Sequence, residues 1–123
     1  MDKPVILLVE DNPSISKLVE YKLSKDGYDV QTRNNGLDGY KAAVELIPDV
    51  LVLDVMMPGM TGFELLEKFR AQLPNAHTKT IMLTSKSREE DIKRGFDLGA
   101  VEYISKPFKI GELSMRVKKV FDS

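Results

Sequence analysis

The 123-residue sequence contains no cysteine and only one histidine. Without cysteine the chain has no disulfide framework, no zinc–thiolate site and no thiol nucleophile. This absence is compatible with a cytoplasmic protein, the location that we expect. The single histidine, His77, lies in the polar segment PNAHTK, and we interpret it as a solvated loop residue.

The sequence also lacks a large excess of charge of one sign and any long apolar run. The formal net charge is -1, so the chain has no basic surface of the kind that binds nucleic acid or an anionic membrane. The apolar run near the N-terminus, Val5 to Val9, is too short for a signal-peptide core or a membrane span. We therefore expect no direct contact with nucleic acid and none with a membrane.

Five short apolar runs are present instead, and they predict five β-strands. They cover residues 5–9, 28–32, 49–53, 80–84 and 101–104. The first, the third and much of the fourth are apolar throughout, which is typical of central strands that are covered on both faces. Polar residues in the second run indicate an edge strand.

Between these runs the apolar residues follow the i, i+3, i+4, i+7 spacing of a helix that buries one face. The four clearest sets are Ile15, Leu18, Val19 and Leu23; Tyr40, Ala43, Val44 and Ile47; Phe63, Leu66, Phe69 and Leu73; and Leu113, Val117, Val120 and Phe121. A weaker helix over about residues 88–98 has Ile92 and Phe96 as its main anchors.

Alternating strands and helices predict one α/β domain, which we place over residues 1–123, with a doubly wound parallel sheet and helices on both faces. A five-stranded sheet of flavodoxin-like order 2-1-3-4-5 fits this pattern best. In such folds ligands bind beyond the carboxyl ends of the strands, near the point where the strand order reverses. The polar residues at those ends are therefore candidate site residues.

The predicted strand ends carry a distinctive set of polar groups. These are Glu10 and Asp11 after strand one, Asp54 after strand three, Thr84 and Ser85 at strand four, and Lys106 after strand five. Acids after a strand often only cap the next helix. Here Asn12, Thr61 and Ser87 are available as caps, the last two in the capping-box patterns TGFE and SREE. The acids are thus left for chemistry.

Three crowded carboxylates repel one another unless a cation relieves them. All-oxygen ligands suit a hard ion, and few protein ligands with room for water and phosphate favour Mg²⁺ over a calcium cage. Mn²⁺ is an alternative, whereas the absence of imidazole and thiolate ligands argues against zinc or copper. A carboxylate beside such an ion can act as a nucleophile on a phosphoryl group, with Lys106 and Thr84 contacting its oxygens.

With these features, the sequence resembles the receiver domain of two-component response regulators, of the single-domain chemotaxis-regulator type. The matching segments are VEDNP, LVLDVMMPGMTGFELL, MLTSK and YISKPF, and together they span nearly the whole chain. The resemblance implies a phosphorelay protein in which Asp54 accepts phosphate from a histidine kinase, a phosphotransfer protein or a small phosphodonor. It also implies that Asp11, Asp54 and the Met56 carbonyl ligate Mg²⁺, and that Glu10 acts mostly through a metal-bound water.

The resemblance further implies a switch. Lys106 would bind the phosphoryl group, Thr84 would move toward it, and Tyr103 would rotate inward. The change would bias the surface formed by helix four, strand five and helix five, which an output partner or a second copy of the domain would read. The family also usually has a cis bond at the position of Lys106–Pro107.

Four positions bear on phosphate access, phosphate lifetime and pairing. Ser85 is small, as phosphate access requires, and Met56 and Lys86 stand where the family tunes the lifetime of the phosphate. Because apolar Met56 cannot orient an attacking water, we predict slow self-dephosphorylation. Val101 replaces an acid that helps two domains pair in the winged-helix transcription factors of the family, so we do not expect that dimer.

Two other classes of function stay open at this stage. A scaffold that works without phosphate is disfavoured, since no residue of the core site is missing. A Mg²⁺-dependent phosphatase on a similar fold would need a general acid two residues after Asp54, where Met56 stands, and a cap insertion that the chain does not have. The chain is either a complete single-domain regulator or the receiver part of a longer protein.

Overall fold

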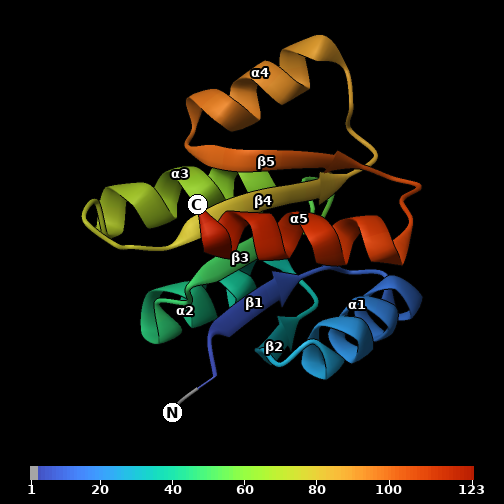
Figure 1. Cartoon of the computed structure of the whole chain (residues 1–123). Coiled ribbons are helices and arrows are strands. Elements are labelled where there is room, and N and C mark those ends of the chain that lie inside the picture. The colour runs from blue at the N-terminus through green and yellow to red at the C-terminus, as the bar shows by residue number, and fades with distance from the viewer. Residues whose placement is uncertain (1–2) are drawn as a thin grey trace.

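A computed structural model describes residues 3–123 and has strands and helices in strict alternation (Figure 1). The strands are β1 (Val5–Val9), β2 (Asp29–Arg33), β3 (Val50–Leu53), β4 (Lys79–Thr84) and β5 (Ala100–Ser105). The helices are α1 (Pro13–Lys25), α2 (Gly36–Leu46), α3 (Gly62–Gln72), α4 (Glu89–Asp97) and α5 (Ile110–Asp122).

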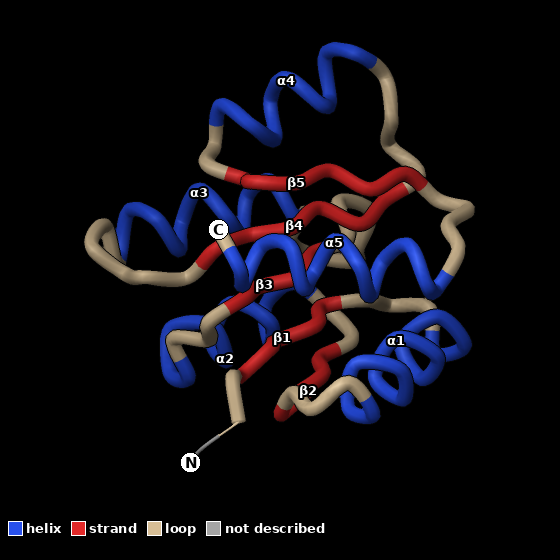
Figure 2. Tube along the Cα trace, viewed as in Figure 1, coloured by secondary structure: helices blue, strands red, loops and turns tan. Residues whose placement is uncertain are grey.

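All five strands are parallel, in the order β2-β1-β3-β4-β5, which confirms the predicted sheet (Figure 2). Val9 pairs with Leu53, so the chain leaves β1 and β3 side by side. Leu53 in turn pairs with Met82 on β4. This register brings the acids that follow β1 and β3 to the same edge of the sheet.

The helices form two layers, one on each side of the sheet (Figure 1). α1 and α5 cover one face, and their apolar side chains pack on Ile6, Leu8 and other residues that point to that side. α2 and α3 cover the other face, with α4 beside β5 at the far edge. β1 and β3 lie between the two helix layers. Because successive side chains of a strand point to opposite faces, each side chain of these two strands faces a helix layer, and both strands are apolar throughout.

The edge strand β5 contains a bulge at Val101. Thr80 pairs with Ala100 and the next residue, Ile81, pairs with Glu102, so Val101 has no opposite residue on β4. Ala100 and Tyr103 consequently pack in the same core cluster although they are three positions apart. In a regular strand those two side chains would point to opposite faces.

Helix starts agree with the predicted caps at two of three positions. The side chain of Asn12 accepts hydrogen bonds from the backbone N–H groups of Ser14 and Ile15, and Thr61 forms the predicted capping box with Glu64. The predicted cap at Ser87 is wrong. α4 begins one residue later, after Arg88, and three acids in its first turn favour that end electrostatically instead.

Three residues of the predicted buried helix stripes are exposed. Leu18 is 49% exposed on α1, and Phe96 is 45% exposed on α4. Ile47 lies beyond the last turn of α2, where it ends the helix in a left-handed conformation with φ 44°. Within residues 3–123 no helix is both long enough and apolar enough to cross a membrane.

Candidate functional site

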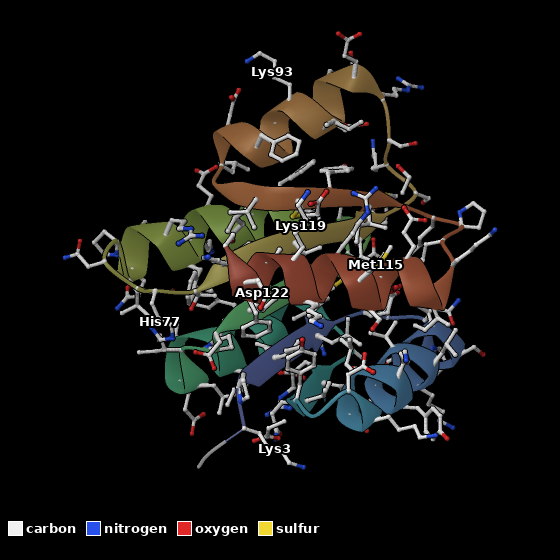
Figure 3. All side chains as sticks on the ribbon, viewed as in Figure 1. Lys3, His77, Lys93, Met115, Lys119 and Asp122 are labelled. Carbon is white, nitrogen blue, oxygen red and sulfur yellow. The ribbon has the colours of Figure 1, made fainter. Side chains whose placement is uncertain are left out.

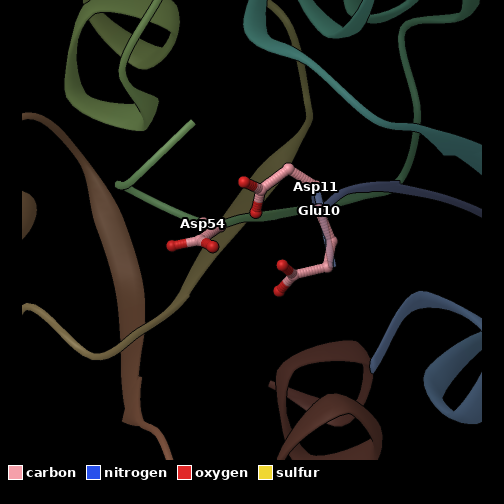
Figure 4. Close-up of side chains that lie close together, drawn as sticks. All are labelled: Glu10, Asp11 and Asp54. Atoms are coloured by element: carbon pink, nitrogen blue, oxygen red, sulfur yellow. The ribbon is translucent and has the colours of Figure 1, made fainter. Parts of the chain in front are cut away.

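Glu10, Asp11 and Asp54 converge at the carboxyl edge of the sheet, where β1 and β3 end (Figure 4). Each offers one carboxylate oxygen, and the three atoms lie within 4.8 Å of one another. Glu10 and Asp54 are buried, whereas Asp11 is exposed. The cluster therefore has one open side, through which a ligand can reach it.

Lys106 brings a positive charge to this cluster from the loop after β5. Its ammonium nitrogen lies 2.6 Å from Oε1 of Glu10 and 3.0 Å from Oδ2 of Asp54. The backbone N–H of Lys106 donates to the Thr84 carbonyl, which continues the pairing of β4 with β5 up to the site. The Lys106–Pro107 bond is cis, in keeping with the resemblance.

The Asp54 carboxylate is oriented by two contacts of different kinds. Oδ1 accepts a hydrogen bond from the backbone N–H of Met56 at 3.0 Å, and Oδ2 faces Lys106. No helix cap draws on this carboxylate, because Thr61 caps α3. Asp54 thus keeps its oxygen atoms at the open site.

Burial and ion pairing act against each other at Glu10 and Lys106. It raises the pKa of Glu10 above its ordinary value, and the negative charge of Asp54 adds to that effect, while hydrogen bonds from Lys106 and Asn12 oppose it. Burial alone would lower the pKa of Lys106. Its hydrogen bonds to Glu10 and Asp54, together with their negative charges, outweigh burial and raise that pKa.

The predicted switch residues lie on β4 and β5, the two strands beyond β3 in the sheet. Thr84 is fully buried at the end of β4, and its hydroxyl oxygen accepts a hydrogen bond from the backbone N–H of Lys86. Tyr103 is only 9% exposed, and its ring packs in the core cluster on the side of α2 and α3. Its hydroxyl donates a hydrogen bond to the Lys86 carbonyl. Ser85 lies between these groups and is exposed.

Met56, which the resemblance predicts to influence phosphate lifetime, has a side chain that is 52% exposed. Lys86, the second residue of that prediction, is also exposed. No nitrogen or oxygen atom of the Met56 side chain is available to bind water, because the side chain ends in a thioether. Slow self-dephosphorylation of Asp54 therefore stays a prediction.

Sequence reasoning missed the contribution of Gly62 to the site. A Cβ atom on Gly62 would lie 2.3 Å from the backbone oxygen of Asp54. The backbone N–H of Gly62 also donates to the Val55 carbonyl. A glycine in the first turn of a helix is the only sequence signal for this close approach.

His77 lies at the other end of the sheet, where the strands begin (Figure 3). It is mostly exposed, as expected, but it has a partner: its Nε2 lies 3.2 Å from Oδ1 of Asp49. The second carboxylate oxygen of Asp49 accepts from the backbone N–H of Val5. His77 is therefore a surface residue with no contact to the carboxylate cluster.

The carboxylate cluster fits a hard divalent cation. Its donors are all oxygens, and no imidazole or thiolate is present. Lys106 is the one cation that contacts Glu10 and Asp54 in the described part of the chain, so one positive charge faces two buried carboxylates. Glu10, Asp11 and Asp54 are the residues that could hold such an ion.

Fold and site together define a doubly wound α/β domain with an acidic, lysine-bearing site at the sheet edge. The family model for the response regulator receiver domain matches residues 6–118. The chain belongs to this family.

Curated relatives match over nearly the whole chain. RpaA of Synechocystis sp., a DNA-binding dual master transcriptional regulator, is 40% identical over 94% of this chain and 48% of its own length. The alkaline phosphatase synthesis regulator PhoP of Bacillus subtilis is 41% identical over 94% of this chain and 47% of its own length. The chain thus spans about half the length of these relatives.

Solved structures agree with the fold. A CheY-like receiver domain of Methanospirillum hungatei has a TM-score of 0.91 at 28% identity, over 98% of this chain and 95% of its own. The BeF3-activated receiver domain of DrrB has a TM-score of 0.88 at 35% identity, and the match covers 100% of both chains.

Proposed function

We propose that the domain is a phosphoacceptor in which Asp54 takes a phosphoryl group from the phosphohistidine of a histidine kinase or phosphotransfer protein. The observation that carries this proposal is the position of Asp54. Its carboxylate lies buried at the end of a central strand, with Lys106 at 3.0 Å and two further acids beside it. A carboxylate oxygen attacks phosphorus, and the phosphorus–nitrogen bond breaks as the histidine leaves with the electron pair.

Lys106 and Thr84 would contact the oxygens of the transferred group. The Lys106 ammonium is a point charge that already faces Asp54, and the Thr84 hydroxyl is a hydrogen-bond donor at the neighbouring strand end. Bound Mg²⁺, held by Glu10, Asp11 and Asp54, would neutralise the charge that accumulates on the phosphoryl oxygens. The Met56 backbone carbonyl is a further ligand in this proposal.

Phosphorylation would then act as a local change of charge. The phosphoryl group adds about two negative charges and new acceptor oxygens. Thr84 and Lys106 gain partners, and the segment from Thr84 to Tyr103 responds. In this proposal the surface of α4, β5 and α5 transmits the state to an output partner or to a second copy of the domain.

Acetyl phosphate and Mg²⁺ test the proposal directly. We expect a mass gain of one phosphoryl group that is acid-stable and base-labile, in the wild type and in the surface variant Asp97→Asn, but not in Asp54→Asn. Uptake by Asp54→Asn would contradict the assignment of the acceptor. No uptake by the wild type would favour a phosphate-independent scaffold, and rapid hydrolysis of phosphate esters would favour an enzyme.

A further inference from the structure

Gly95 is the one buried residue of α4. Positive φ angles occur at Gly27, Gly59 and Gly99 among the described glycines, and Gly95 is not one of them. The backbone therefore does not require glycine at this position. A glycine inside a helix is unfavourable relative to alanine, so its presence needs another reason.

The ring of Tyr103 fills the space that a side chain on Gly95 would need. A Cβ atom on Gly95 would lie 2.9 Å from Cε2 and 3.0 Å from Cδ2 of Tyr103, and 3.5 Å from Cγ of Met82. The two shortest distances are to one edge of the ring. That edge packs directly against the backbone of α4.

The Tyr103 ring has little freedom to move away from this contact. The ring is buried, and its hydroxyl is held by the Lys86 carbonyl. The ring of Phe96 lies beside it, with the centroids 6.4 Å apart and the planes tilted by 46°. Space for an additional methyl group would require the ring to turn outward or α4 to move off β5.

We propose that Gly95 is a positioning residue for Tyr103: the space left by its missing side chain admits the ring and links α4 to the loop after Thr84. The inference rests on the proposed function for its biological meaning, since it assigns part of the switch to α4. The link consists of two hydrogen bonds. The Tyr103 hydroxyl donates to the Lys86 carbonyl, and the Lys86 N–H donates to the Thr84 hydroxyl oxygen at 3.2 Å.

The same contact gives the proposal a spectroscopic readout. Burial, assisted by the negative charges of Asp91 and Asp54, raises the pKa of Tyr103 to about 12. A ring that turns into solvent loses most of that effect. Complete release toward the ordinary value of 10.0 would change the deprotonation equilibrium about a hundredfold.

Gly95→Ala and Gly111→Ala make a matched pair for the experiment. Gly111 is exposed on α5, and a Cβ atom there would meet nothing within 4 Å. The titration of Tyr103 is followed in the unphosphorylated full chain by NMR of the tyrosine rings, with the signal assigned through Tyr103→Phe. We expect Gly95→Ala to lower the pKa of Tyr103 and Gly111→Ala to leave it unchanged. A wild-type titration in Gly95→Ala would overturn the proposal.

A second comparison separates positioning from a general need for glycine. Tyr103→Leu removes the ring edge, so Gly95→Ala should destabilise the chain less in that background than in the wild type. Equal losses of stability in both backgrounds would overturn the proposal, even if Gly95→Ala alone folds poorly.

A measurement of phosphoryl uptake by the wild type separates a failure of this inference from a failure of the proposed function. If the wild type takes no phosphoryl group from acetyl phosphate, the proposed function fails, while the titration still decides the contact. If it does, we expect phosphorylation to shift the Tyr103 signal, and Gly95→Ala to reduce that shift by at least half. An undiminished shift in Gly95→Ala would contradict the link between α4 and Thr84.

Discussion

The Lys106 ammonium nitrogen lies 3.0 Å from Oδ2 of Asp54, although 52 positions separate the two residues. The contact exists because β3 and β5 flank β4 and end at the same edge of the sheet. The same ammonium faces buried Glu10 at 2.6 Å. One cation thus offsets two buried carboxylates, and their charges remain incompletely balanced.

Replacing Lys106 by methionine should therefore destabilise the domain. Removal of one partner from a buried ion pair costs about 3–5 kcal/mol, and we expect about 3 kcal/mol because the lysine side chain is partly exposed. Mg²⁺ should restore most of the loss, since it supplies positive charge to the same carboxylates. Urea unfolding with and without Mg²⁺ measures both effects.

Lys118→Met is the control, because Lys118 is exposed on α5. It should change the free energy of unfolding by less than about 0.5 kcal/mol. If Lys106→Met behaved like Lys118→Met, the lysine would not compensate the buried acids.

A carboxylate at the lifetime position should shorten the life of phosphorylated Asp54. Met56→Glu places a proton acceptor two residues after the acceptor site, where it can orient an attacking water. A general base usually accelerates a reaction by at least about a hundredfold. We expect the half-life of phosphorylated Asp54 to fall by up to about a hundredfold. Met115→Glu is the control, on a side chain of α5 that is 69% exposed (Figure 3). Equal half-lives in the wild type and Met56→Glu would contradict the prediction of slow dephosphorylation through Met56.

An alanine at Gly62 should distort the backbone that carries Asp54. The added Cβ atom would lie 2.3 Å from the backbone carbonyl oxygen of Asp54. A backbone atom cannot rotate away as the end of a flexible side chain can. We expect a loss of about 1–3 kcal/mol in stability and slower phosphoryl uptake. Gly111→Ala, in open space, should keep both. Thermal unfolding and acetyl phosphate uptake are the two measurements, and an unimpaired Gly62→Ala would show that α3 can shift freely.

The contact between α1 and α5 should depend on pH through Asp26. A hydrogen bond from Ser114 lowers the pKa of Asp26, burial opposes it, and the hydrogen bond and charge of Lys22 lower it further. A depressed pKa stabilises the fold above the ordinary value of 3.8 and loses that contribution as the pH falls through the folded-state value. Ser114→Ala should raise the pKa of Asp26 toward 3.8 in an NMR titration of the carboxyl group.

Ser14→Ala, in the exposed first turn of α1, is the matched control. It should leave the Asp26 titration unchanged. The difference in stability between the wild type and Ser114→Ala should be present near neutral pH and vanish in strong acid. A difference that persists in acid would point to packing rather than to the charge of Asp26.

Much of the candidate site could be predicted because the relevant signals are local. Periodicity placed Glu10, Asp54 and Thr84 at strand ends, and the rules for parallel sheets brought those ends together. Caps were predictable where one competent side chain stood before the helix, as at Asn12 and Thr61. The start of α4 was not, since Ser87 and the acids that follow it both favour a helix N-terminus.

The sequence by itself determined which elements form and which chemical groups stand at the strand ends, because both follow from spacing along the chain. The tertiary structure alone decided how close those groups come, since distances such as that from Lys106 to Asp54 depend on strand register. It also decided that Tyr103 points inward, through the bulge at Val101 and the missing side chain of Gly95. Those features depend on contacts between segments that are distant in sequence, and no local pattern records them.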